Sequence, residues 1–164
     1  HVEWANDTVN AYAWISGGKR HVAILGGLIR HQAMHVEGIG LVVAHELGHH
    51  YGGDPTYPNS PLSCEGQSDF WAAFIGMREV WWGPEYVRQM QEAIVQLDGL
   101  FAGIILPDGS GDPGFLPEPS KEVSAPLQCS HPPAACRKQT YQAGLEAKPK
   151  PVCAGIGPHE GFAQ

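Results

Sequence analysis

Residues 40–49 of this chain read GLVVAHELGH, and its fold is predicted from them first. It contains the pattern H-E-x-x-H, in which His45 and His49 stand four residues apart and Glu46 follows the first of them. Residues four apart share one face of a helix, so both imidazoles can point at a single metal ion. Glu46 would lie beside that ion, where it can take a proton from a zinc-activated water molecule. The pattern predicts a zinc peptidase centre, against the alternative of two surface histidines on an ordinary helix.

The residues on either side of the pattern favour a helix. Residues 41–44 are apolar, and Gly52-Gly53 provides a stop, because glycine adopts the left-handed C-terminal cap at little cost. Elsewhere the spacing of apolar residues indicates short strands and further helices. The expected elements are strands at 10–15 and 22–25 with a turn at 17–18, helices at 40–51, 64–80, 85–97 and 137–145, and an interruption at 81–84.

A catalytic zinc takes a third protein ligand and keeps its fourth position open. Glu65 is the candidate, since it starts the second predicted helix, and Asp69 follows one turn later on the same face. Asp69 can accept the free N–H of a zinc-bound histidine and so fix the tautomer of that histidine. Taken alone, the two acidic residues would be explained as a first helical turn favoured by the helix dipole. The histidine pair upstream favours the ligand interpretation.

The other possible ligands are weaker candidates. His50 follows His49 directly, and adjacent helical residues point about 100° apart, so the two cannot both face the ion. Cys64 precedes Glu65, and a disulfide accounts for this cysteine better than metal binding. The remaining histidines lack ligand spacing and are expected to be ordinary surface or core residues; they are His21, His31, His35 and His159.

The composition excludes some classes of partner. The chain has 17 acidic and 10 basic residues, a net charge of −7 and no Lys/Arg cluster, so no nucleic acid is expected to bind. No apolar run reaches the roughly 18 residues of a transmembrane segment. No signal peptide is visible, and the start at His1 rather than Met suggests either a trimmed chain or a processed product. The length suits one domain, 1–164, in which the Pro/Gly-rich stretch 106–127 is either a lid over the cleft or a disordered insertion.

Four cysteines bear on the cellular location. They are Cys64, Cys129, Cys136 and Cys153, and the last three lie in the C-terminal segment 128–164. Four cysteines allow three pairings, among which the sequence does not choose. Because no C-x-x-C arrangement occurs, disulfides are favoured over a second metal site. We therefore expect an exported protein, either periplasmic or secreted.

Three separated motifs carry a resemblance to a known family. Residues 10–13 form the first motif, and residues 40–49 with Glu65 and Asp69 form the second. The third is residues 130–133 followed by Arg137. In the same order, they resemble the N-A-F-A strand, the zinc helix with its E-x-x-x-D partner, and the T-H-P…R element of the gluzincin peptidases. That family includes the membrane protease HtpX, the CAAX prenyl endopeptidases and soluble periplasmic relatives such as BepA.

The resemblance implies roles that spacing alone does not. Asn10 and the backbone of Ala11 and Ala13 would line the cleft and pair with an extended substrate. His131 would approach the metal, either to stabilise the oxyanion or to occupy the open position of zinc in a resting state. Arg137 would support the site through a carboxylate or a substrate carbonyl.

Together these observations predict an α+β protein with a zincin-like fold, in which a small, mostly antiparallel sheet packs on the zinc helix and further helices lie below the metal. The expected function is that of an endopeptidase with one Zn²⁺ per chain, acting on internal peptide bonds of proteins or peptides. Ser68 replaces the alanine of the family, the transmembrane helices are missing and the cysteines are extra, so the substrate is left open. A zinc-bearing binding or chaperone-like protein with latent activity is the alternative. A thermolysin-type enzyme is disfavoured by the short chain and the His131-Pro132 element.

Overall fold

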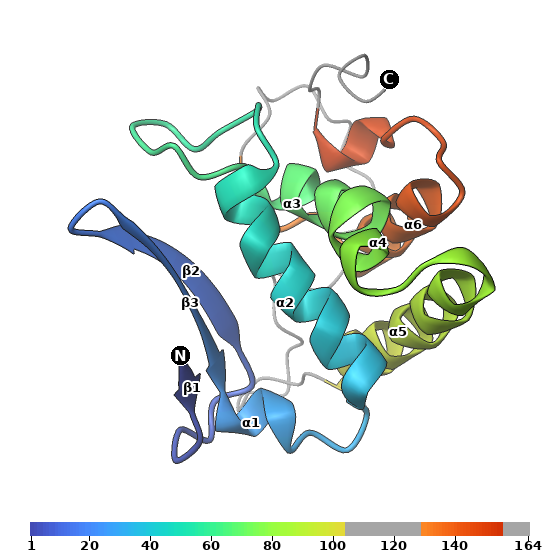
Figure 1. Ribbon diagram of the computed structural model, residues 1–164, viewed down its shortest axis with the longest axis horizontal. Helices are drawn as coiled ribbons and strands as arrows, with labels where there is room; N and C mark the ends of the chain where they lie inside the picture. The colour runs from blue at the N-terminus through green and yellow to red at the C-terminus, as the bar shows by residue number, and fades with distance from the viewer. Residues whose placement is uncertain (104–128, 156–164) are drawn as a thin grey trace.

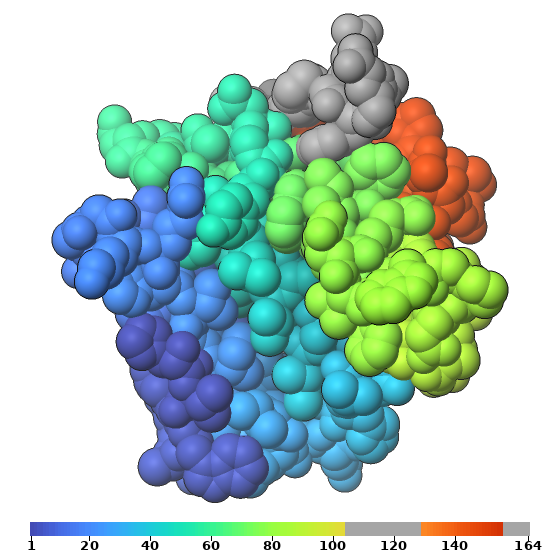
Figure 2. All heavy atoms as spheres, in the orientation of Figure 1, coloured from blue at the N-terminus to red at the C-terminus, as the bar shows by residue number. Residues whose placement is uncertain are grey.

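Helix α2 (Val36–Tyr51) runs through the middle of the computed structural model, which describes residues 1–103 and 129–155 (Figure 1). A three-stranded sheet lies on one side of α2, and the remaining long helices lie on the other. The space-filling view shows the strand residues gathered on one flank of the molecule (Figure 2). The protein is thus α+β, as the sequence predicts. The predicted loop at 106–127 and His159 lie outside the described residues.

The sheet consists of β1 (Val2–Glu3), β2 (Ala11–Ser16) and β3 (Lys19–Leu25), in the order β1-β3-β2. Strand β2 is antiparallel to β3, whereas the short β1 pairs with β3 in parallel, so the sheet is mixed. The turn at Gly17-Gly18 has positive φ at both residues, 56° and 74°, a conformation that glycine adopts cheaply. Because the turn is tight, β2 and β3 stay paired up to the turn itself. β3 therefore begins three residues earlier than predicted.

Helix α2 begins at Val36, four residues before the predicted start at Gly40. The reason is a tertiary contact, because no side chain next to the helix in sequence caps its first turn. Instead, Oε1 of Gln96 accepts the backbone N–H groups of His35 (2.9 Å) and Gly38 (2.8 Å). The side chain of another helix thus satisfies these backbone N–H groups. Nothing in the sequence next to the helix indicates such a cap.

The predicted helix at 64–80 is divided into three parts. They are α3 (Glu65–Trp71), the π-helical segment η1 (Ala72–Gly76) and α4 (Met77–Val80). The Tyr86 hydroxyl donates to the carbonyl of Ala73 inside the π segment (2.7 Å). A widened turn frees carbonyl groups from the regular helical ladder, and this hydroxyl satisfies one of them.

Two of the remaining helices are longer than the periodicity predicts, and two short ones are not predicted. Gly83 and Pro84 already belong to a helix, so only Trp81 and Trp82 form the interruption. Gly83 has φ of 60°, which glycine tolerates, and proline fits the first turn because that turn needs no donor. These elements are α1 (Gly26–Ile29), α5 (Gly83–Gly103), α6 (Ala134–Leu145) and the 3₁₀ turn η2 (Val152–Ala154).

One cluster of buried apolar side chains joins α2 to the helices beside it. Its fully buried members include Leu41 of α2, Met77 of α4, Met90 of α5 and Tyr141 of α6. Removing these side chains from water is the main force that holds the helices against α2. The core thus fixes the helix that carries the H-E-x-x-H pattern from the side opposite the sheet.

Two disulfides connect the C-terminal segment to the rest of the fold. Cys64 pairs with Cys129, and Cys136 pairs with Cys153, which selects one of the three possible pairings. The first bond joins the residue before α3 to the segment that leads to His131. Among residues 1–103 and 129–155, none of the helices combines the length and the apolarity needed to span a bilayer.

Candidate metal centre and active site

His45, His49 and Glu65 form a buried cluster between α2 and α3. One ligand atom from each residue lies within 4.8 Å of the other two. Nε2 of His45 is 3.1 Å from Oε2 of Glu65, and Nε2 of His49 is 3.6 Å from Oε1 of the same carboxylate. Gly48 permits this approach of the two helices, because a Cβ atom there would lie only 2.7 Å from the carbonyl oxygen of Ser68. The structure thus brings together the three residues that the sequence predicts as ligands.

The distances and chemistry of this cluster fit a metal ion. Ligands held about 2.1 Å from a tetrahedral zinc ion lie roughly 3.4 Å apart, close to the two separations above. Oε2 of Glu65 is buried and makes no hydrogen bond within the described part of the chain, as a carboxylate oxygen reserved for a cation would. Two imidazoles and one carboxylate are also a ligand set that catalytic zinc sites use.

The charges around the cluster also favour a bound cation. Glu46, Glu65 and Asp69 place three buried carboxyl groups around the two histidines. Among the described residues in contact with these groups, Arg137 supplies the permanent positive charge. A divalent cation would balance the remaining negative charge, which is costly to bury unpaired. The residues present therefore fit a bound metal.

The far nitrogens of the two histidines are held by acceptor groups. Nδ1 of His45 is 2.7 Å from Oδ1 of Asp69, and Nδ1 of His49 is 2.7 Å from the carbonyl oxygen of Ser63. Because an ionised carboxylate and a carbonyl only accept, each Nδ1 carries a proton, and Nε2 of each ring is the atom left for a metal ion. Both histidines are thus set in the tautomer that binds metal through Nε2.

Asp69 is held by a buried network that extends to α6. It has no solvent exposure, and Arg137 donates to its two oxygens from Nε (2.8 Å) and Nη2 (2.7 Å). The Tyr141 hydroxyl donates to the same carboxylate and also accepts from Arg137 (3.0 Å). The carboxylate that Arg137 was expected to meet is therefore Asp69. Tyr141 was missed in the sequence, although its place one helical turn after Arg137 could have suggested it.

Glu46 is buried beside the cluster, with 5% of its surface exposed, and it lines two hollows next to His45. Burial raises the pKa of Glu46 to about 7, although the charge of a protonated His45 would oppose the shift. A carboxyl group with a pKa near neutrality can both take up and release a proton at physiological pH. Glu46 therefore has the surroundings of a general acid–base group.

The pKa values of the cluster reflect both burial and the charges of neighbouring groups. Burial lowers the pKa of His49 to about 4. Burial acts against ionisation of Glu65 too, yet the adjacent His45 lowers the pKa of this carboxyl to about 2. For His45, the adjacent Asp69 and Glu65 outweigh burial and raise the pKa. The carboxylates of Glu65 and Asp69 thus favour positive charge on His45, whereas burial disfavours it on His49.

Two polar residues of the site carry no recognisable sequence signal. The hydroxyl of Tyr57, in the connection between α2 and α3, donates to Oε1 of Glu65 (2.6 Å). This leaves Oε2 as the oxygen turned toward His45. The hydroxyl of Ser68 lies 3.0 Å from Nδ1 of His49. Both contacts depend on how the connection folds over the cluster, which local patterns do not reveal.

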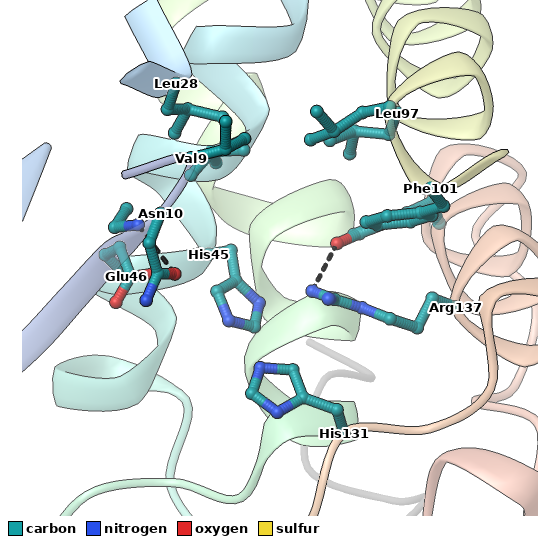
Figure 3. Close-up of a pocket in the computed structure, with 13 residues that line it drawn as sticks. Val9, Asn10, Leu28, His45, Glu46, Leu97, Phe101, His131 and Arg137 are labelled. Atoms are coloured by element: carbon teal, nitrogen blue, oxygen red, sulfur yellow. Dashed lines mark hydrogen bonds between the residues drawn. The ribbon is translucent and has the colours of Figure 1, made fainter. Parts of the chain in front are cut away.

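His131 stands at the edge of the same centre. Its Nε2 is 3.2 Å from Oε2 of Glu65, its side chain is 45% exposed, and it is not one of the three clustered ligands. Figure 3 shows its ring below that of His45, across the hollow from Asn10. The disulfide at Cys129, two residues before His131, ties this segment to the start of α3. His131 is therefore placed to contact a molecule bound at the centre.

A cleft of about 500 Å³ opens in front of the cluster, and β2 forms one of its walls. β2 is an edge strand, and the carbonyl of Asn10 accepts from Leu25 of β3 (3.1 Å). Because backbone groups alternate along an antiparallel strand, those of Ala11 and Ala13 turn toward the open edge. Oδ1 of Asn10 accepts the N–H of Ala11 (2.9 Å). The three residues predicted to bind substrate thus line the cleft.

The remaining histidines lie apart from the cluster where the structure describes them. Nε2 of His50 contacts the carbonyl oxygen of His21 (2.9 Å), on a different face of α2 from His49. Nδ1 of His31 accepts the N–H of Ala33 (3.2 Å). None of these histidines is part of the described metal-binding group.

Comparison with protein-family models, with curated proteins and with solved structures finds no match for this chain. The function therefore has to be argued from the geometry of the site.

Proposed function

We propose that the protein is a zinc-dependent endopeptidase with a zincin-like fold and a gluzincin-type centre. The observation that carries the proposal is the buried triplet of His45, His49 and Glu65, with the carboxyl group of Glu46 beside it. When bound there, zinc would supply Lewis acidity toward a scissile carbonyl and an attacking water molecule. Structural zinc sites normally use four protein ligands, whereas a set of three leaves a position for a substrate.

In this proposal Glu46 moves the protons of the reaction. It would accept a proton from the attacking water molecule and pass it to the nitrogen of the leaving amine. The burial that raises its pKa to about 7 suits both transfers. His131, whose Nε2 faces the centre from the other side, would donate to the carbonyl oxygen as negative charge develops on it.

Three residues behind the predicted metal ligands keep these ligands in place. Asp69 lies 2.7 Å from Nδ1 of His45, while Arg137 and Tyr141 hold the Asp69 carboxylate in a single orientation. Groups of this kind orient metal ligands and often change metal affinity by about 10–100-fold when removed. Arg137 is therefore proposed as a positioning residue and not as a group that touches the substrate.

The substrate class follows from the edge strand beside the metal centre. An extended peptide can add to β2 by hydrogen bonds to the carbonyl of Ala11, whose N–H is taken by Oδ1 of Asn10, and to the backbone of Ala13. This arrangement, together with the motif order, supports membership of the family of HtpX, the CAAX prenyl endopeptidases and BepA. The two disulfides support an exported protein, since such bonds persist in oxidising compartments.

The decisive experiment compares the wild type with the Glu46→Gln variant. Both are expected to bind one zinc ion per chain by metal analysis, because Gln removes the base and keeps the ligands. The wild type should cleave casein or a quenched peptide and lose this activity with a chelator, whereas the variant should be inactive. Cleavage by the zinc-loaded variant would overturn the role of Glu46. Zinc and peptide binding without any cleavage by the wild type would favour the binding-protein alternative.

A further inference from the structure

The Cys64–Cys129 disulfide lies next to two parts of the metal centre. Cys64 is the residue before Glu65, the predicted third ligand, and Cys129 is two residues before His131. The Cα atoms of the two cysteines are 4.5 Å apart. One covalent bond therefore joins the start of the helix that carries the carboxylate ligand to the segment that carries His131.

The segment that carries His131 is held to α3 at both of its ends. At one end, Cys129 is bonded to Cys64, which precedes the first turn of that helix. At the other end, Arg137 of α6 donates two hydrogen bonds to Asp69 of α3. Because two residues of extended chain span roughly 7 Å at most, His131 cannot move far from Cys129.

The chain next to His131 is also stiff. Pro132 and Pro133 follow it, and the ring of a proline fixes the φ angle of that residue. A residue before proline is largely confined to extended conformations, and His131 is such a residue. A stiff segment passes the position of its ends on to its middle, so the place of the His131 ring depends on the anchor at Cys129.

The same disulfide restrains the first turn of α3. Glu65 is the first residue of this helix, and no side chain caps the helix at Cys64. The ends of helices fray most readily, because their terminal backbone groups lack partners within the helix. The disulfide and the hydrogen bond from the N–H of Cys64 to the carbonyl of Pro55 (2.8 Å) hold this end. The position of the Glu65 carboxylate, and with it the affinity for a metal, should therefore depend on the bond.

One sulfur of the bond is open to attack by a thiol. Cys64 is buried, with 7% of its surface exposed, whereas Cys129 is partly exposed. A thiolate of a dithiol can attack Sγ of Cys129, and the sulfur of Cys64 then leaves as a thiolate and takes up a proton. The second thiol of the reagent attacks the mixed disulfide and releases Cys129. The dithiol is thereby oxidised to a disulfide, and the two cysteines are reduced to thiols.

We propose that the Cys64–Cys129 disulfide is a positioning element of the metal centre, which is fully formed only in the oxidised protein. The inference rests on the proposed function and adds a form of regulation to it. Reduction weakens zinc binding through Glu65 and slows the reaction through His131. Both cysteines act through these neighbours and are positioning residues.

The first test compares the two disulfides of the chain. Cys64→Ser/Cys129→Ser removes the bond beside the metal centre, and Cys136→Ser/Cys153→Ser removes the bond between α6 and η2 as the matched control. In a competition assay with a chelating dye, the first variant should bind zinc at least about fivefold more weakly than the wild type, as is typical of coupled sites. The control should bind zinc as the wild type does. Equal zinc affinities of the two variants would overturn the proposal, and thermal melting checks that both are folded.

The second test keeps both cysteines and so does not depend on the folding of the first variant. Cys136→Ser/Cys153→Ser retains only the Cys64–Cys129 bond, so a dithiol reduces that bond alone. The protein is reduced, its two thiols are blocked with a small alkylating reagent, and zinc affinity and peptide cleavage are measured. Both should fall, and protein that is reoxidised in place of alkylation should regain them. Unchanged zinc affinity after reduction would contradict the proposal.

A third measurement shows whether the bond acts on the reaction through His131. At saturating zinc, Cys64→Ser/Cys129→Ser should lower kcat about tenfold and leave KM nearly unchanged, because stabilisation of the transition state is what is lost. In a His131→Ala background the same change should lower kcat less than about twofold, since the imidazole to be positioned is gone. Equal losses in the two backgrounds would refute the action through His131.

The zinc measurements separate failure of this proposal from failure of the proposed function. If the wild type cleaves no peptide, the proposed function fails, yet weaker zinc binding by Cys64→Ser/Cys129→Ser alone still supports the role of the disulfide. If the wild type cleaves peptides and the zinc affinities of the two variants are equal, the proposed function stands and the role of the disulfide is refuted.

Discussion

Replacing Arg137 with methionine should destabilise the protein strongly, because the change leaves Asp69 buried without its main counter-ion. Asp69 has no solvent exposure and receives two hydrogen bonds from the guanidinium group, at 2.8 and 2.7 Å. Removing one partner of a buried ion pair typically costs about 3–5 kcal/mol. The hydrogen bond from Tyr141 to Asp69 and the 2.7 Å contact between Asp69 and Nδ1 of His45 would remain, so we expect about 3 kcal/mol for Arg137→Met.

The measurement is denaturant unfolding of the zinc-free protein with its disulfides intact. Zinc is left out because a ligand that binds the native state raises the apparent stability. Arg88→Met serves as the matched control, since Arg88 pairs with Glu85 on the surface, where its side chain is 55% exposed. An exposed pair of this kind contributes about 1 kcal/mol or less.

The double variant Arg137→Met/Asp69→Leu gives a sharper test of the reasoning. If the cost of Arg137→Met comes from an uncompensated buried carboxylate, removing that carboxylate as well should recover part of the lost stability. Additive losses from the two changes, or a cost of Arg137→Met no larger than that of Arg88→Met, would refute the explanation.

Three further predictions concern two residues that contact the metal ligands and one of the two disulfides. Asp69→Asn should weaken zinc binding about 10–100-fold in a competition assay with a chelating dye, because an amide holds the histidine N–H less well than a carboxylate; unchanged affinity would contradict this. Tyr57→Phe removes the hydrogen bond to the carboxylate ligand and should weaken zinc binding about tenfold, whereas Tyr12→Phe, which loses a surface contact to another glutamate, should not. Replacing Cys136 and Cys153 by serine opens a loop of 17 residues and should lower the free energy of unfolding by about 3 kcal/mol; a loss below 1 kcal/mol would count against the loop-entropy account.

The local pattern of the sequence was enough for the elements that depend on neighbours along the chain. Gly17-Gly18 predicted the turn between β2 and β3, and Gly52-Gly53 predicted the end of α2 at Tyr51. In the observed cap Gly52 keeps a right-handed conformation, and Gly53 takes the positive φ of 74°. Boundaries set by distant residues were predicted less well. The start of α2 depends on Gln96, which lies 58 residues after Gly38.

In the candidate site, too, some features depend on neighbours along the chain and others on distant residues. The spacing of four between His45 and His49 places both imidazoles on one helical face wherever that helix lies, so the sequence alone determined this part of the site. Glu65 was only predicted to meet the two imidazoles. The packing of α3 on α2 across Gly48 brings its carboxylate to them.

The tertiary structure alone decided which groups surround the ligands. It selected the two cysteine pairs, aimed the Tyr57 hydroxyl at Glu65, and buried Tyr141 against Asp69. The physical reason is that hydrogen bonds, ion pairs and apolar contacts act over a few ångströms in space, whatever the separation along the chain. Periodicity reports only the contacts that a regular helix or strand makes with its own neighbours.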